Sequence, residues 1–183
     1  MAYDNRGAAY RAKGEYDRAI ANYAKAIEID PKDSNAYYNR GIAYHSKKDY
    51  DRAIADYTKA IELNPKYATA YNNRGNAYDN KGEFDRAITD YNKAIELNPK
   101  DAEAYYNRGH AYSSKKDYDR AITDYNRAIE IHPKFANAYY NRGRVWETKG
   151  DKQRAVADYR VYLAIDPSDQ GAKDALKRLG ASP

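Results

Sequence analysis

Residues 34–67 read SNAYYNRGIAYHSKKDYDRAIADYTKAIELNPKY, and this stretch decides the fold. Its pattern returns every 34 residues along almost the whole chain, and one proline marks each period: Pro31, Pro65, Pro99, Pro133 and Pro167. A unit this short cannot bury a core of its own and must stack on its neighbours. The sequence therefore predicts an array of repeats at 1–33, 34–67, 68–101, 102–135 and 136–169, followed by a tail.

Each repeat is predicted to be a pair of antiparallel helices. Apolar side chains recur at helical spacing over 36–47 and again over 50–63. Asp49 between them can cap the second helix, because its carboxylate can accept hydrogen bonds from free N–H groups. Pro65 ends that helix, since the residue before a proline is pushed out of the α region. The predicted fold class is therefore all-α.

Small residues and tyrosines recur in register. A glycine inside a helix costs about 1 kcal/mol relative to alanine, so the return of Gly41 at Gly75 and Gly109 indicates close approach of two helices. The chain has 22 Tyr, which supply much of its apolar area. A core of Ala, Ile and Tyr is expected, with internal hydrogen bonds to the buried hydroxyl groups.

The period and these spacings resemble the tetratricopeptide repeat (TPR) over almost the whole chain. The matching positions of the second repeat are Tyr37, Gly41, Tyr44, Ala53, Tyr57, Ala60 and Pro65. The resemblance implies an α-solenoid of about five repeats in one TPR domain (1–183), wound as a right-handed superhelix and closed by a capping helix over 170–180. It also implies a concave groove, lined by the first helices, that binds a peptide or partner protein.

One row departs from the family pattern. The residue before the repeat glycine is usually Leu, but here it is arginine: Arg6, Arg40, Arg74, Arg108 and Arg142. Four aspartates recur in step, and Asn22 takes their place in the first repeat: Asp56, Asp90, Asp124 and Asp158. One interpretation is a ladder of Arg–Asp pairs that joins the two helices of each repeat. The other is a surface pair between Asp56 and Arg52.

A second rhythm spans two repeats. The turn between the two helices alternates in type: Gly14, Lys48, Gly82, Lys116 and Gly150. The second position after each proline alternates between aspartate and an aromatic residue: Asp33, Tyr67, Asp101, Phe135 and Asp169. A block of two repeats has therefore been copied, which makes alternate repeats chemically alike.

The family resemblance places the ligand-contacting residues on the first helices. Asparagine can hold the main chain of an extended peptide, and tyrosine offers flat contact area. The alternative is that the Asn row bridges neighbouring helices. The candidates are Tyr38, Asn39, Ile42, Asn72, Asn73, Asn76, Tyr106, Asn107, His110, Tyr140, Asn141 and Arg144. A further row faces the same side: His45, Asp79, Ser113 and Glu147.

One subclass of the family clamps the C-terminal carboxylate of chaperones with five residues. Asn76 and Asn107 match its two asparagines. Its basic residues would fall on Asn72, Asn137 and Asn141, none of which carries a charge. Without these cations a terminal carboxylate lacks compensation for losing water. Tight binding of chaperone tails is therefore not expected.

Other chemistry is not indicated. The three histidines, His45, His110 and His132, lie too far apart in the repeat array to share a metal, and the glycines are isolated rather than gathered in a phosphate loop. No catalytic residues and no cofactor are therefore predicted. The net charge of +5 combines 32 basic with 27 acidic side chains, so no nucleic-acid partner is expected.

The leading expectation is a non-enzymatic scaffold that binds a peptide or protein. No apolar run reaches the length of a membrane span, and no signal peptide is recognisable, which favours the cytoplasm without assigning a compartment. The stripe of Ala172, Ala175, Leu176 and Leu179 predicts a C-terminal cap. The N-terminal repeat has no comparable cap, so self-association through that end is the alternative function.

Overall fold

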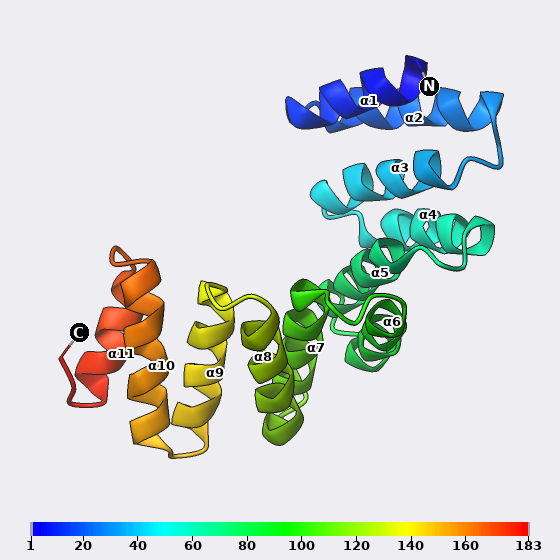
Figure 1. Cartoon of the computed structure of the whole chain (residues 1–183). Coiled ribbons are helices and arrows are strands. Elements are labelled where there is room, and N and C mark those ends of the chain that lie inside the picture. Colours follow the sequence, from blue (N-terminus) through cyan, green and yellow to red (C-terminus); the bar gives the residue numbers. More distant parts are fainter. Residues whose placement is uncertain (1, 183) are drawn as a thin grey trace. The chain divides into compact units, whose positions relative to one another are not determined.

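The computed structural model describes residues 2–182, and these residues form eleven helices and no strand (Figure 1). The helices are α1 (Ala2–Ala12), α2 (Tyr16–Ile29), α3 (Ser34–Ser46), α4 (Tyr50–Leu63), α5 (Ala68–Asn80), α6 (Phe84–Leu97), α7 (Ala102–Ser114), α8 (Tyr118–Ile131), α9 (Ala136–Thr148), α10 (Lys152–Ile165) and α11 (Gln170–Arg178). The predicted all-α class and its helix pairs are confirmed.

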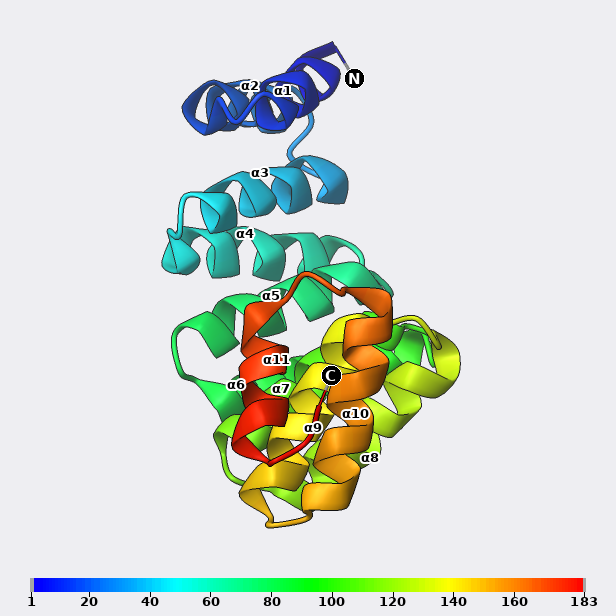
Figure 2. The ribbon, with the colours of Figure 1, turned by 90° about the vertical axis from the view of Figure 1, so that its left-hand side faces the viewer.

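The helices divide into two compact units. The first contains α1–α6 and ends at Pro99, and the second begins at Lys100 and contains α7–α11. Within the first unit, the pairs α1–α2, α3–α4 and α5–α6 pack in chain order, as Figure 2 shows for the first two pairs. Within the second unit, α7–α8 packs on α9–α10, and α11 packs on α10. A single domain over 1–183 remains a prediction.

All five turns between paired helices contain one residue with a left-handed backbone. Gly14, Gly82 and Gly150 have φ values of 75°, 76° and 81°, and Lys48 and Lys116 have 61° and 62°. Glycine adopts this conformation without steric cost, whereas a residue with a Cβ atom is strained there. The alternation seen in the sequence therefore places two strained lysines in otherwise equivalent turns.

Replacing Lys48 with glycine is expected to stabilise the first unit by about 1 kcal/mol, because the strain at φ 61° disappears. Urea denaturation followed by circular dichroism measures the change. Lys47→Gly is the control: its φ is −81°, so glycine relieves no strain there. It adds chain entropy and removes the exposed pair with Asp17, and should therefore destabilise. Equal shifts of the two variants would contradict the prediction.

The linker position that alternates between Asp and an aromatic residue has two structural roles. Asp33, Asp101 and Asp169 each cap the following helix by accepting hydrogen bonds from its first backbone N–H groups. Tyr67 instead packs its ring 4.7 Å from that of Tyr38, and Phe135 lies 4.9 Å from Tyr106. The two-repeat block thus carries one capped and one aromatic linker.

Glycine and tyrosine pair across each repeat. A Cβ atom on Gly41 would lie 2.7 Å from a ring carbon of Tyr57, and one on Gly75 would lie 2.6 Å from Tyr91. Atoms of real side chains do not approach this closely, so these positions need glycine. The tyrosine rings are almost wholly buried, as the sequence predicts.

The Arg–Asp ladder is present. In the second repeat, Nε and Nη2 of Arg40 donate to the two carboxylate oxygens of Asp56, each at 2.7 Å. Arg74–Asp90, Arg108–Asp124 and Arg142–Asp158 form the same two bonds at 2.7–2.9 Å. In the first repeat Arg6 donates to Asn22. The surface interpretation is wrong, because Arg52 bonds to Asp49 instead.

Each of these pairs lies inside one repeat and is mostly buried. The side chains of Arg40 and Asp56 are 21% and 8% exposed. The hydrogen bond to Asp56 raises the pKa of Arg40 above its ordinary value, against the opposing effect of burial. The guanidinium therefore holds the two helices of its own repeat together, at the position where the family usually has leucine.

A different set of ion pairs joins neighbouring repeats at the turns. Lys81 donates to Asp51 of the preceding repeat at 2.6 Å, and Lys149 does the same to Asp119 at 2.7 Å. Lys47 pairs with Asp17 in the same way. These aspartates are 83–87% exposed, so the pairs belong to the solvated edge of the stack and contribute little to stability.

Helix α11 closes the end of the second unit. Ala172, Ala175 and Leu176 are buried against α10 in a cluster that includes Tyr159 and Tyr162. The carboxylate of Glu147 on α9 also accepts from Nε of Arg178 at 2.9 Å. This confirms the capping role predicted from the apolar stripe.

Candidate functional site

The candidate ligand-contacting residues lie on the first helices of four repeats. In the first unit these are α3 and α5, which contact each other, and in the second unit α7 and α9, which do the same. In each unit these two helices and the second helix of the earlier repeat surround one pocket. The two pockets, one in each unit, are therefore the candidate sites.

The pocket of the first unit has a volume of about 200 Å³. Three of its five lining residues are sequence candidates, and the other two are His45 and Tyr57: Ile42, His45, Tyr57, Asn73 and Asn76. Burial lowers the pKa of His45, so its ring is neutral near pH 7. The lining of this pocket thus carries no charge.

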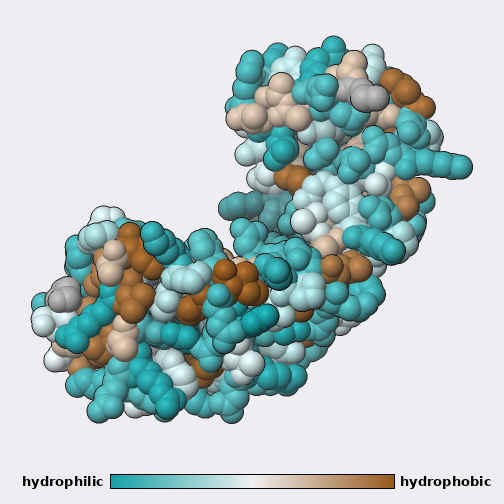
Figure 3. Space-filling view, viewed as in Figure 1, coloured by the Kyte–Doolittle hydropathy of each residue, from teal (hydrophilic) through white to brown (hydrophobic). Residues whose placement is uncertain are grey.

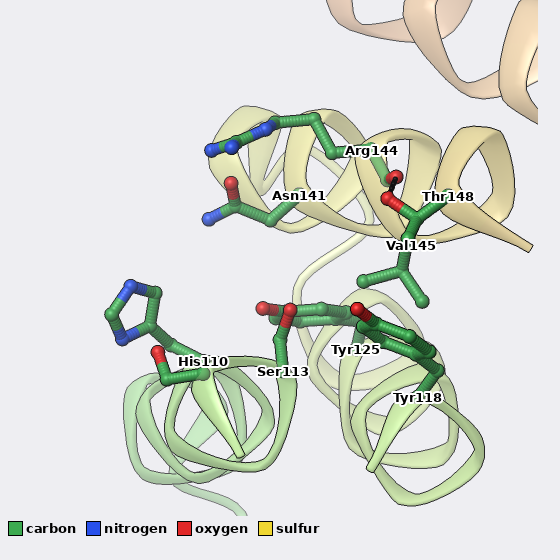
Figure 4. A pocket seen from close by; sticks show the side chains of 9 residues that line it. His110, Ser113, Tyr118, Tyr125, Asn141, Arg144, Val145 and Thr148 are labelled. Atoms are coloured by element: carbon green, nitrogen blue, oxygen red, sulfur yellow. Dashed lines mark hydrogen bonds between the residues drawn. The ribbon is translucent and has the colours of Figure 1, made fainter. Parts of the chain in front are cut away.

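The pocket of the second unit has a volume of about 270 Å³ (Figure 4). It is lined by His110, Ser113, Ser114, Tyr118, Tyr125, Asn141, Arg144, Val145 and Thr148. Figure 4 shows Val145 above the rings of Tyr125 and Tyr118, while the polar ends of Arg144 and Asn141 extend toward the side where His110 lies. The apolar surface of Val145 and the tyrosine rings is thus grouped on one side of a pocket whose lining is otherwise polar.

The two pockets are the same structural site, two repeats apart. Every residue of the first pocket has its counterpart in the second at the position 68 residues later. Asn73 corresponds to Asn141 and Tyr57 to Tyr125, whereas Asn76 corresponds to Arg144. The duplication inferred from the sequence thus reaches the candidate site, with changes at its variable positions.

The asparagines of the pockets also bridge neighbouring repeats. Nδ2 of Asn73 donates to the hydroxyl of Tyr38 at 3.0 Å, and Nδ2 of Asn141 donates to that of Tyr106 at 2.8 Å. Both bonds connect the first helices of consecutive repeats. The structural interpretation of the Asn row therefore holds at these two positions, and the bonds fix the amide groups beside each pocket.

The tyrosine row is packed rather than fully open. The rings of Tyr38 and Tyr106 each lie 5.9 Å from the buried tyrosine of their own repeat, and Tyr140 lies 5.1 Å from Tyr162. All three are half-buried, as are Asn39 and Asn107. Asn72 is only 5% exposed. Little of its side chain is therefore open to a ligand, and its role in binding stays a prediction.

Several lining residues escape the sequence prediction. The repeat pattern assigns Tyr57 and Tyr125 to the core, and they are 1% exposed, yet each borders a pocket from below. Burial raises the pKa of Tyr57 well above its ordinary value, so this hydroxyl stays protonated. Tyr118 and Thr148 lie near helix ends, where the repeat pattern gives no signal for a pocket. His45 and Ser113, from the further row, do line the pockets.

Asn76 is held by a buried hydroxyl. The hydroxyl of Tyr91 donates to Oδ1 of Asn76 at 2.7 Å. Tyr91 is 1% exposed, and burial raises its pKa, so the hydroxyl remains a donor. The amide of Asn76 is therefore oriented, which prepares its nitrogen to meet a ligand at low entropy cost.

Within residues 2–182, no group of three or more His, Cys, Asp or Glu side chains is placed to hold a metal ion. Over the same residues, no helix is both long enough and apolar enough to cross a membrane. The surface in Figure 3 is mostly hydrophilic, with small apolar patches.

The helix pairs and the pockets between them define an α-helical repeat scaffold. Family models described as "TPR repeat" match residues 7–48 and 80–116, and models described as "Tetratricopeptide repeat" match 34–67, 56–89, 102–135 and 136–169. The chain belongs to the tetratricopeptide repeat family. Its members are typically protein-interaction scaffolds without catalytic activity.

Solved structures agree with this assignment. The crystal structure of MamA is 33% identical, with a TM-score of 0.81 over 88% of this chain and 94% of that one. YrrB, described as a TPR protein with an unusual peptide-binding site, is 27% identical, with a TM-score of 0.79 over 96% and 90%. Pseudomonas aeruginosa pilF shares the fold, with a TM-score of 0.88 at 18% identity over 98% and 82%. No curated protein sequence matches the chain.

Proposed function

We propose that this protein binds extended peptide segments of partner proteins, and that each of the two pockets receives a peptide side chain. The observation that carries the proposal is the repetition of one pocket at the same structural position in both units. YrrB, a relative with the same fold, has a peptide-binding site, which supports this class of ligand.

The lining chemistry supports the same conclusion. Asn73 and Asn141 use an N–H to bridge repeats, and each amide still carries a carbonyl oxygen and a second N–H. These groups match the donors and acceptors of a peptide main chain. Tyr57 and Tyr125 supply an apolar surface beneath them. A polar rim around an aromatic centre is the usual arrangement of small binding sites.

The proposal predicts that peptides selected from a random display library bind the purified protein and lose affinity when a pocket is altered. His110→Ala combined with Ser113→Ala should weaken binding about tenfold, because each substitution removes a polar contact that the pocket wall offers to the ligand. Isothermal titration calorimetry measures the affinity. Both residues lie on the pocket wall and outside the buried core, so helicity should not change.

Thr123→Ala is the control, because Thr123 is exposed on α8 and does not line the pocket. It should leave the affinity unchanged. Failure to select any peptide, or equal affinity of the pocket variant and the control, would refute the proposed function.

A further inference from the structure

The pocket of the second unit differs from its counterpart by one positive charge. Arg144 stands where the first unit has Asn76, and none of the nine lining residues is acidic. The corresponding pocket of the first unit has no Lys, Arg, Asp or Glu in its lining. The two pockets therefore occupy equivalent positions and differ in their electrostatics.

The guanidinium of Arg144 forms no ion pair, although its charge contributes, after that of Arg178, to lowering the pKa of Glu147. Glu147 lies one turn further along α9, but its carboxylate accepts from Nε and Nη2 of Arg178 at 2.9 and 3.1 Å and from the hydroxyl of Tyr159 at 2.8 Å. Across the part of the chain that the structure describes, the guanidinium of Arg144 makes no hydrogen bond or ion pair. It is exposed at the mouth of the pocket.

Other donors surround the same opening. Asn141 is fixed by its bond to Tyr106 and retains a second N–H. The hydroxyl of Ser113 comes from α7 on the opposite wall. Below them, Tyr125 and Val145 are 1% and 3% exposed and present apolar surface. An anionic group at the mouth with a short apolar stem beneath it fits this distribution.

Building on the proposed function, we propose that the pocket of the second unit binds a carboxylate of the peptide ligand, with the guanidinium of Arg144 as its main partner. A glutamate side chain fits best, because its methylene groups can cover Tyr125 and Val145 while its carboxylate accepts from Arg144. The position is distinct from the chaperone-tail clamp, whose basic residues would fall on Asn72, Asn137 and Asn141. The neutral pocket of the first unit has no such preference.

NMR titration of the full chain tests this with short probes. The first is the capped tripeptide acetyl-Ala-Glu-Ala-amide, and its matched partner carries Gln in place of Glu. Acetyl-Ala-Ala-Ala with a free C-terminus provides the carboxylate from the terminus instead, and inorganic phosphate provides a different anion. The side-chain N–H signals of Arg144 and Asn141 report binding at the pocket.

The Glu probe should bind about tenfold more tightly than the Gln probe, because one charge-assisted hydrogen bond is lost with the neutral amide. Arg144→Gln should abolish this preference, and Arg144→Lys should keep part of it. Arg127→Gln removes an equal charge from α8, where Arg127 pairs with Glu130, and should change nothing. Asn76→Arg should create the preference in the first unit. If Asn76→Arg unfolds, the inference is tested by Arg144→Gln and Arg144→Lys alone.

If the probe with a free C-terminus binds more tightly than the Glu probe, the pocket still recognises a carboxylate. That carboxylate is then the one at the end of the peptide chain. Equal binding of the Glu and Gln probes, an unchanged preference in Arg144→Gln, or a response to phosphate alone would overturn the inference. If library peptides bind without any preference for acidic residues, the inference fails while the proposed function stands. If neither library peptides nor probes bind, both fail.

Discussion

Replacing Asp56 with alanine is expected to lower the free energy of unfolding of the first unit by about 3 kcal/mol. The carboxylate accepts two hydrogen bonds of 2.7 Å from Arg40. Its removal leaves a mostly buried guanidinium without a counter-ion. This loss lies at the lower end of the range of destabilisation found when buried ion pairs are broken. The reason is that 21% of the Arg40 side chain is still exposed to water. Urea denaturation of the purified chain measures the change.

Two further variants distinguish the effect of the buried Arg40–Asp56 pair from that of an ordinary surface charge. Asp51→Ala removes a carboxylate that is 83% exposed on the same helix and should change stability by less than about 0.5 kcal/mol. Asp56→Asn gives the second repeat the kind of contact that Arg6 and Asn22 make in the first repeat. Its loss in free energy of unfolding should lie between those of Asp56→Ala and Asp51→Ala. Similar losses for Asp56→Ala and Asp51→Ala would show that the ladder contributes no stability.

Replacing Leu176 with alanine is expected to destabilise the second unit by about 3 kcal/mol. Leu176 is 0% exposed and packs in the cluster that contains Tyr159, Tyr162 and Leu163. The smaller side chain leaves a cavity between α11 and α10 and weakens the cap. Hydrogen exchange should show early loss of protection in α11 and then in α10.

Lys177→Ala is the control, because Lys177 is exposed on the same helix. Alanine has the higher helix propensity by only a small margin, so its effect should stay within about 0.5 kcal/mol. Unchanged protection of α11 in Leu176→Ala would mean that the cap is held by its polar contacts, such as Arg178 with Glu147, rather than by burial.

The repeat scaffold could be predicted because its causes are local. Asp49 caps α4 and accepts from the backbone N–H of Arg52, as its position before an apolar stripe indicates. The Arg–Asp ladder was also within reach, since both residues recur in step at a fixed separation. The division into two compact units after Pro99 could not be predicted, because the 34-residue pattern continues through that point unchanged.

The pockets could be predicted only in outline. Tyrosine suits a core and a binding surface equally, so the sequence does not tell that Tyr38 would turn toward Tyr57 and Tyr67. Asn72 occupies the same repeat position as Tyr38 and is nevertheless buried. Each pocket forms where three helices pack together. The apolar periodicity of any one helix does not predict this packing.

The two kinds of ion pair respond differently to ionic strength. Pairs such as Arg40–Asp56 lie within one hairpin and are shielded from solvent, whereas pairs such as Lys81–Asp51 link one hairpin to the next and are exposed. Added salt screens the second kind far more than the first. Rising salt therefore loosens the coupling between hairpins by fractions of a kcal/mol while each hairpin stays closed, and unfolding becomes less cooperative.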